Sequence, residues 1–227
     1  MTERETPSVD GLVIGILGGT GDQGRGLARR FALAGHQVII GSRSSERAAA
    51  AAQEIGHGIQ GLANADAARG ASVIIAAVPW EGHGDLLSAL AGELAGKIVV
   101  DCVNPLGFDQ RGAYALPVAE GGPAEGSAAQ QAAALLPGSR VVAAFHHVSA
   151  VLLLDPEVDT IDLDVLVLGD DRAATDLVQA LAARIPGVRG IYAGRLRNCG
   201  QIEALTANLV SINRRYKAHA GLRVTDI

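Results

Sequence analysis

An apolar run that leads directly into clustered glycines constrains this chain more than any other feature. Residues 13–24 read VIGILGGTGDQG, in which Gly19, Gly21 and Gly24 fit the spacing G-x-G-x-x-G. Such glycines permit a tight turn off a strand, close backbone approach to a pyrophosphate, and close packing of the next helix. The segment follows a predicted strand and opens a predicted helix, so it predicts a dinucleotide site rather than an ordinary glycine-rich turn.

The rest of the chain alternates strand-like and helix-like segments. Strands are expected at 12–17, 37–41, 59–62, 72–78, 97–102 and 140–145, and helices at 21–34, 44–55, 84–94 and 127–136. This alternation predicts right-handed βαβ units and a parallel sheet, a doubly wound α/β fold of the Rossmann type. Residues 104–126 hold three prolines and five glycines and are expected to form one long loop, a kind that is often functional.

The last third begins with an acidic stretch and ends with a periodic one. A strand at 164–168, a helix at 173–184 and a short strand at 188–192 are expected, followed by a helix from 199 to about 220. Within that helix, Ile202, Leu205, Leu209 and Ile212 fall at steps of three, four and three, which places them on one face. This face is interpreted as a domain or dimer interface.

Composition narrows the class of protein. The 227 residues are 48% hydrophobic but only 3% aromatic, which suits a parallel sheet buried on both faces. A formal net charge of −5 argues against a nucleic-acid or membrane partner, and no apolar run reaches the length of a membrane span. Cys102 and Cys199 are the only cysteines, so no disulfide framework is expected and a cytoplasmic location is predicted.

The end of the second predicted strand indicates which dinucleotide binds. An NAD-binding fold usually has an acidic residue there to hold the ribose 2′-hydroxyl. This chain instead has Ser42 and Arg43, with Arg47 one turn into the next helix. A guanidinium suits a phosphate, so the pattern favours NADP, with Glu46 expected to point to solvent; the alternative is a helix cap with surface charges.

With these pieces placed, the chain resembles the family of F-420:NADP oxidoreductases, which use a deazaflavin coenzyme. The resemblance extends over about residues 13–213. It is carried by GGTGDQG at 18–24, GSR at 41–43, VPW at 78–80, VVD at 99–101, Asn104-Pro105, His146 and EALT at 203–206.

The resemblance implies a homodimer whose subunits have two domains. A tail at 1–10 precedes a dinucleotide-binding domain at 11–150 and a small C-terminal α/β domain at 151–227. The deazaflavin is implied to lie in the cleft between these domains, facing the nicotinamide. NADP is implied to contact Gly19, Thr20, Gly21, Asp22, Gln23, Ser42, Arg43 and Arg47, with Val78 and Ala150 near the nicotinamide. Further expected cofactor contacts are Pro79, Trp80, Asn104, Asn198, Leu205 and Thr206, although Trp80 fits a structural plug equally well.

Hydride transfer between two bound rings depends on positioning and electrostatics, so neither a nucleophile nor a metal is expected. His146 is the candidate catalytic residue, because donors such as His146 or Asn198 can stabilise charge on the deazaflavin. His147 directly follows it. Adjacent residues of a strand point to opposite faces, which disfavours a shared metal site and leaves the role of His147 open.

The resemblance implies that coenzyme F-420 is a substrate, and the phosphate and glutamate of its tail would make that substrate an anion. Residues 195–223 hold six basic residues against one acid, Glu203. This segment is either an anion-attracting patch or a solvated helix end.

Two other functions stay open. One is an NADPH-dependent reductase of a small imine or carbonyl compound. The other is a non-enzymatic sensor of NADP(H) that binds a partner through residues 104–126. A short-chain reductase is disfavoured, because none of the three tyrosines begins a Tyr-x-x-x-Lys pair.

Overall fold

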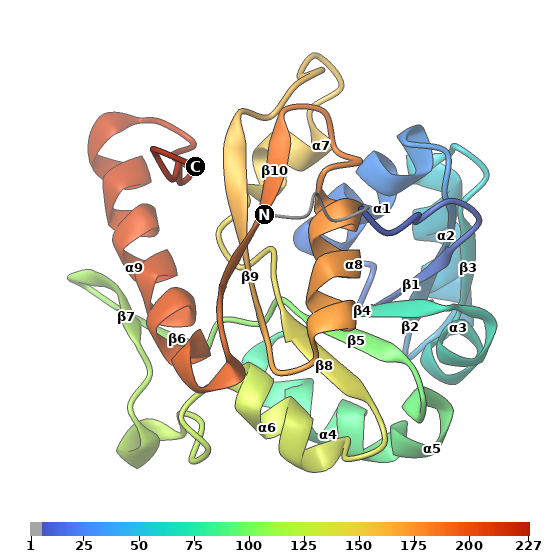
Figure 1. Cartoon of the computed structure of the whole chain (residues 1–227), viewed down its shortest axis with the longest axis horizontal. Helices are drawn as coiled ribbons and strands as arrows, with labels where there is room; N and C mark the ends of the chain where they lie inside the picture. Colours follow the sequence, from blue (N-terminus) through green and yellow to red (C-terminus); the bar gives the residue numbers. More distant parts are fainter. Residues whose placement is uncertain (1–5) are drawn as a thin grey trace.

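The computed structural model describes residues 6–227 and contains one large sheet flanked by helices on both faces (Figure 1). The large sheet comprises β1 Val13–Leu17, β2 Gln37–Ser42, β3 Gln60–Ala63, β4 Val73–Ala76, β5 Ile98–Asp101, β8 Arg140–Ala143, β9 Leu163–Gly169 and β10 Val188–Gly194; β6 Leu106–Asp109 and β7 Gly112–Ala115 form a separate hairpin. The helices are α1 Asp22–Leu33, α2 Ser45–Ile55, α3 Asn64–Gly70, α4 His83–Ala89, α5 Ala91–Leu94, α6 Ala128–Leu135, α7 Ala150–Leu154, α8 Arg172–Ala182 and α9 Cys199–Tyr216, with 3-10 turns η1 Trp80–Gly82, η2 Val118–Glu120 and η3 Leu196–Asn198.

The strand order of the large sheet is β10-β9-β8-β5-β4-β1-β2-β3. The chain therefore proceeds from β1 outward through β2 and β3, and then crosses back to β4 on the other side of β1. The β8–β9 pair is antiparallel, and every other pair in this sheet is parallel. This confirms the doubly wound fold, in which ligands bind at the carboxyl ends of the strands where the order reverses.

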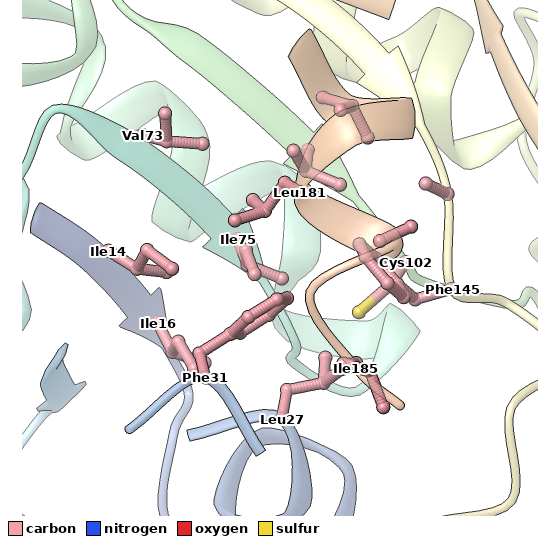
Figure 2. Packing of buried hydrophobic residues seen from close by; sticks show 14 of the residues in the cluster. Ile14, Ile16, Leu27, Phe31, Val73, Ile75, Cys102, Phe145, Leu181 and Ile185 are labelled. Carbon is pink, nitrogen blue, oxygen red and sulfur yellow. The ribbon is translucent and has the colours of Figure 1, made fainter. Parts of the chain in front are cut away.

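Each face of the sheet has its own apolar core. Ile75 and Ile74 are neighbours on β4, and they belong to the two separate clusters of buried side chains. On one face, Phe31 of α1 meets Phe145 edge to face with ring centroids 5.9 Å apart, and Figure 2 shows Phe31 among Ile16 and Ile75. Burial of both faces explains why these strands read as unbroken apolar runs.

The structure departs from the sequence expectation between residues 104 and 126. This segment was expected to be a structureless loop, and that was wrong, because it contains the β6–β7 hairpin and η2. The two strands have four residues each, too few for a clear alternation of apolar and polar side chains. At the start of β7, Gly112 adopts φ 130°, a conformation that side chains disfavour.

Other differences concern short helices and helix ends. Helices α3 and α7 were not anticipated, because seven and five residues are too few to show a helical period. Helix α9 ends at Tyr216, earlier than expected, where Lys217 turns left-handed at φ 54°.

The C-terminal part shares the large sheet with the rest of the chain. The expected boundary after Ala150 falls within α7, while β9 and β10 extend the sheet beyond β8. Of the expected N-terminal tail, residues 1–5 lie outside the described residues, and Val9 is buried in the core. No helix in residues 6–227 combines the length and apolar character that a membrane crossing requires.

Candidate active site

The glycine-rich turn joins β1 to α1 through tight backbone contacts. Gly18 has φ +71°, so the left-handed turn falls one residue before the first glycine of the fingerprint. A side chain on Gly18 would strike Val78, and one on Gly24 would come within 2.7 Å of the Cα of Gly19. By contrast, a Cβ on Gly21 would meet only the carbonyl oxygen of Gly18, at 3.8 Å. The turn is therefore packed at Gly18 and Gly24 and open at Gly21.

The open space at Gly21 lies at the start of α1. Gly21 is the N-cap of that 12-residue helix, and no side chain caps it. The first N–H groups of a helix lack intrahelical partners and carry the positive end of the helix dipole. The turn thus fits a pyrophosphate, although the exposed Asp22 carboxylate at the start of α1 adds a negative charge nearby.

The end of β2 presents two guanidinium groups without acidic partners. Arg43 and Arg47 are exposed, and neither forms an ion pair within residues 6–227. Glu46 is exposed, as expected, and its carboxylate accepts hydrogen bonds from the hydroxyls of Ser44 at 2.6 Å and Ser45 at 3.2 Å. The Ser44 hydrogen bond, foremost, lowers the pKa of Glu46. The acid is thus satisfied within its own helix turn.

Ser42 and Ser44 organise the backbone at this point. The Ser44 hydroxyl accepts from the backbone N–H of Arg47 at 3.2 Å and so caps α2. The hydroxyl of the buried Ser42 accepts from the N–H of Ser44 at 3.4 Å. The two interpretations of this segment, a helix cap and a binding site for the 2′-phosphate, are therefore compatible. The cap uses the serine hydroxyls and leaves Arg43 and Arg47 accessible.

Residues far apart in sequence meet around the carbonyl of His146. The Asn104 amide donates to this carbonyl at 2.8 Å, and the Thr206 hydroxyl donates to it at 3.2 Å. The Thr206 hydroxyl also lies 3.3 Å from Oδ1 of Asn104. One residue earlier, the carbonyl of Phe145 accepts from the Gln23 side chain at 3.2 Å. These contacts bring the start of α1, the ends of β5 and β8, and α9 together at one edge of the sheet.

The two histidines have different surroundings. The His146 side chain is fully buried, and burial lowers its pKa to about 4, so the ring is neutral at pH 7. Neither ring nitrogen has a hydrogen-bond partner within residues 6–227. Nε2 of His147 instead lies 2.8 Å from the carbonyl oxygen of Asp164 in β9, and burial lowers the pKa of His147 as well. His147 therefore fixes the loop after β8 against β9.

His83 of α4 forms a polar cluster that sequence reasoning did not assign to the site, and both His83 and Asp101 are buried. Nε2 of His83 lies 2.5 Å from Oδ2 of Asp101, and Nδ1 lies 3.0 Å from Oε1 of Gln131. Burial opposes the charged form of His83, but the hydrogen bond and charge of Asp101 outweigh burial and raise its pKa. The available signal was an acid, Asp101, at the end of an otherwise apolar strand.

Glu203 belongs to the EALT segment that carries the family resemblance, but it was not predicted as a site residue. Its carboxylate accepts from the backbone N–H groups of Ala128 at 2.9 Å and Ala129 at 3.2 Å, at the start of α6. Oε1 also lies 3.9 Å from Nε2 of His146. Burial raises the pKa of Glu203 to about 7, against these hydrogen bonds. Glu203 therefore ties α9 to α6 directly behind His146.

The remaining predicted residues are more dispersed. Trp80 lies against His83 with ring centroids 5.5 Å apart, and its Nε1 donates to the carbonyl of Gly121 at 2.8 Å. This bond ties η1 to the segment after the hairpin, as a structural plug would. Asn198 ends η3 directly before α9 and lies beside Gly194 at the end of β10.

Four other predicted residues lie closer to the turn or to α9. Thr20 lies in the glycine turn, Pro79 follows Val78 on the surface, Ala150 opens α7 where that helix packs on α1, and half-buried Leu205 precedes Thr206.

Known proteins match the chain over nearly its full length. Residues 13–105 match the family model described as NADP oxidoreductase, coenzyme F-420-dependent. An F-420-dependent NADP reductase of Methanothermobacter marburgensis is 40% identical over 226 residues, 95% of this chain and 99% of that protein. The chain belongs to this family. A reductase of the same name from Methanocaldococcus jannaschii is also 40% identical, over 95% of this chain and 99% of its own length.

A solved structure supports the same assignment. The crystal structure of a "putative F420 dependent NADP-reductase" from Arthrobacter sp. FB24 superimposes with a TM-score of 0.81. It is 28% identical and covers 95% of this chain and 100% of that one. The family identified from the sequence is thus confirmed, together with its α/β fold.

Proposed function

We propose that this chain transfers a hydride between NADP(H) and the deazaflavin coenzyme F-420. One combination of features in this member of the reductase family carries the proposal: the start of α1 at Gly21 is uncapped, and Arg43 and Arg47 after β2 have no ion-pair partner among residues 6–227. The first feature accepts a pyrophosphate, and the second a ribose 2′-phosphate. When bound, the nicotinamide and the deazaflavin supply the redox chemistry, and the protein holds them in contact.

In this proposal, separate sets of residues bind the pyrophosphate, the adenosine ribose and the nicotinamide of NADP(H). Thr20, Gly21, Asp22 and Gln23 surround the pyrophosphate with Gly19 beneath it, while Ser42, Arg43 and Arg47 bind the adenosine ribose. The Val78 side chain packs beside Gly18, where it would strike any side chain at that position, and Val78 would contact the nicotinamide end of the bound dinucleotide. Pro79 and Ala150 flank the nicotinamide in this arrangement.

The deazaflavin occupies the edge where Asn104, His146 and Thr206 meet, with Leu205 on α9 and Asn198 immediately before that helix. His146 acts by position, because its side chain is buried and its carbonyl is held by two donors. Trp80 borders the same edge from η1. These residues orient the ring and exclude water, and holding two reactants in place lowers a barrier substantially.

The test is a spectrum of the purified protein with NADPH and oxidised F-420. The proposal predicts loss of the deazaflavin visible band with multiple turnovers. If NADPH binds but the band persists, the chain is not this enzyme. Reduction of a small imine or carbonyl compound would then favour the imine or carbonyl reductase, and inactivity on both would favour a sensor of NADP(H).

The role of His146 has its own test. His146→Ala should lower the turnover number while changing the affinity for NADPH little, because His146 lies at the ring end of the site. An unchanged turnover number would remove His146 from the proposed mechanism.

We also propose a homodimer in the cytoplasm. Ile212 and Tyr216 lie four residues apart on α9 with 40% and 71% exposure, an apolar surface that suits an interface. Cys102 and Cys199 are buried free thiols, which agrees with a reducing compartment. Light scattering of the purified chain tests the dimer, because a mass of 23.2 kDa would indicate a monomer.

A further inference from the structure

A basic groove lies between the tip of the β6–β7 hairpin and the second half of α9. Residues 108–113 form one wall, and Val210, Ser211, Arg214 and Arg215 form the other, around a cavity of about 690 Å³. Figure 1 shows the hairpin beside α9, at one side of the large sheet. The groove is separate from the glycine turn and from the end of β2.

The groove presents three unpaired positive charges. Arg111, Arg214 and Arg215 are exposed, and none of them forms an ion pair within residues 6–227. The single acid in its walls is Asp109, whose Oδ1 accepts from the backbone N–H groups of Arg111 at 2.7 Å and Gly112 at 3.0 Å. The excess of unpaired guanidinium groups favours an anionic ligand.

The structure also divides the basic segment at 195–223. Arg223 is paired with Asp162 and Asp164, and Arg195 lies 4.0 Å from Asp170. These two arginines therefore form ion pairs within the protein. The charges left unpaired on α9 gather instead at Arg214 and Arg215.

Both walls of the groove originate at the ring site. The hairpin begins at Leu106, two residues after Asn104. On α9, Thr206, Val210 and Arg214 follow at intervals of four, so they share one face of the helix. With a rise of 1.5 Å per residue, Arg214 lies about 12 Å along the helix from Thr206. A ligand whose ring contacts Asn104 and Thr206 can therefore extend a chain of that length directly into the groove.

We infer that this groove binds the phosphate and glutamate tail of coenzyme F-420, an inference that rests on the proposed function. Guanidinium groups bind carboxylates and phosphates through paired hydrogen bonds, and they accept successive anionic groups along a flexible chain. The groove thus distinguishes the complete coenzyme from its deazaflavin ring alone.

The test compares two probes: F-420 with its glutamate tail and the tail-less deazaflavin riboside. Their dissociation constants are measured by fluorescence titration of the full chain, and turnover with NADPH is measured in parallel. The unmodified protein should bind F-420 more tightly, and the difference should shrink as salt rises, because exposed charges are screened. Arg214→Gln with Arg215→Gln should weaken F-420 about tenfold and leave the tail-less probe nearly unchanged.

Arg140→Gln is the matched control, since Arg140 is exposed at the amino end of β8, the opposite edge of the sheet. It should change neither dissociation constant. Equal affinity of the unmodified protein for both probes would overturn the inference. So would a double variant that loses both probes equally, because that result would assign the arginines to the ring or the fold.

The two proposals fail in different ways. Turnover of both probes with no effect of the tail would leave the reductase intact and refute the groove. Absence of turnover with either probe, despite NADPH binding, would refute the reductase, and the tail-binding groove with it.

Discussion

Nε2 of His146 lies 3.9 Å from Oε1 of Glu203, and both side chains are buried. Burial acts on the two groups in opposite directions, because it disfavours whichever form is charged. It lowers the pKa of His146 to about 4 and raises that of Glu203 to about 7. Near pH 7 the imidazole is therefore neutral, and Glu203 exists in both protonation states.

Glu203 should make the stability of the protein depend on pH. Its folded-state pKa of about 7 exceeds the ordinary value of 4.5, so between these values the folded protein holds a proton that the unfolded chain has lost. The free energy of unfolding therefore falls as pH rises through this window, by up to about 3 kcal/mol. Relative to Glu203→Gln, the unmodified protein should lose this stability between pH 4.5 and 7.

Denaturant titrations at several pH values measure this difference. Glu157→Gln is the control, because Glu157 is exposed in the turn before β9. A constant difference between Glu203→Gln and the unmodified protein would contradict the assigned titration.

The glycine turn offers a matched pair of substitutions. Gly21→Ala should keep the melting temperature within a few degrees but weaken NADPH at least tenfold, because the new methyl group occupies the open start of α1. Gly24→Ala should instead destabilise the fold by about 1–3 kcal/mol, because its methyl group meets the backbone of Gly19. Thermal unfolding and NADPH titration of both variants would separate the two effects. Equal loss of stability would contradict the open space at Gly21.

Arg43 should discriminate between the two nicotinamide dinucleotides. Arg43→Ala should weaken NADPH about 10- to 100-fold and NADH very little, since a hydrogen bond to a charged group contributes about 1.5–3 kcal/mol. Dissociation constants for both cofactors measure this ratio. Arg140→Ala again provides the control, and comparable losses for NADPH and NADH would refute phosphate recognition by Arg43.

The C-terminal segment should stabilise β9 through Asp164. Its buried carboxylate accepts from Arg189, from Arg223 at 2.9 Å and from the N–H of Val224 at 2.6 Å. The Arg189 hydrogen bond, foremost, holds the pKa of Asp164 well below its usual 3.8, so this stability is present above that pH and lost below it.

Arg223→Ala should therefore lower the free energy of unfolding at pH 7 by about 1–3 kcal/mol. Urea titration measures the loss, with Arg172→Ala as a control, since Arg172 makes only an exposed contact of 3.9 Å with Asp176. Equal stability of the two variants would show that Arg189 alone suffices.

The local sequence pattern was enough to predict the alternating strands and helices of the large sheet. Unbroken apolar runs such as 72–78 predicted strands, because a sheet covered on both faces needs no polar side. The glycine spacing predicted the turn into α1, although the left-handed residue is Gly18. The hairpin at 106–115 was missed because strands of four residues interrupted by glycine carry no readable period.

The sequence by itself determined the fold class, the family and the NADP-type end of β2, because each depends on residues close together in the chain. Only the tertiary structure decided which distant residues meet at the carbonyl of His146, and that Glu203 and Asp101 are buried. It also decided that the unpaired arginines of α9 face the hairpin. The physical reason is that burial and pairing are set by contacts between elements many residues apart, and these contacts exist only once the sheet has assembled.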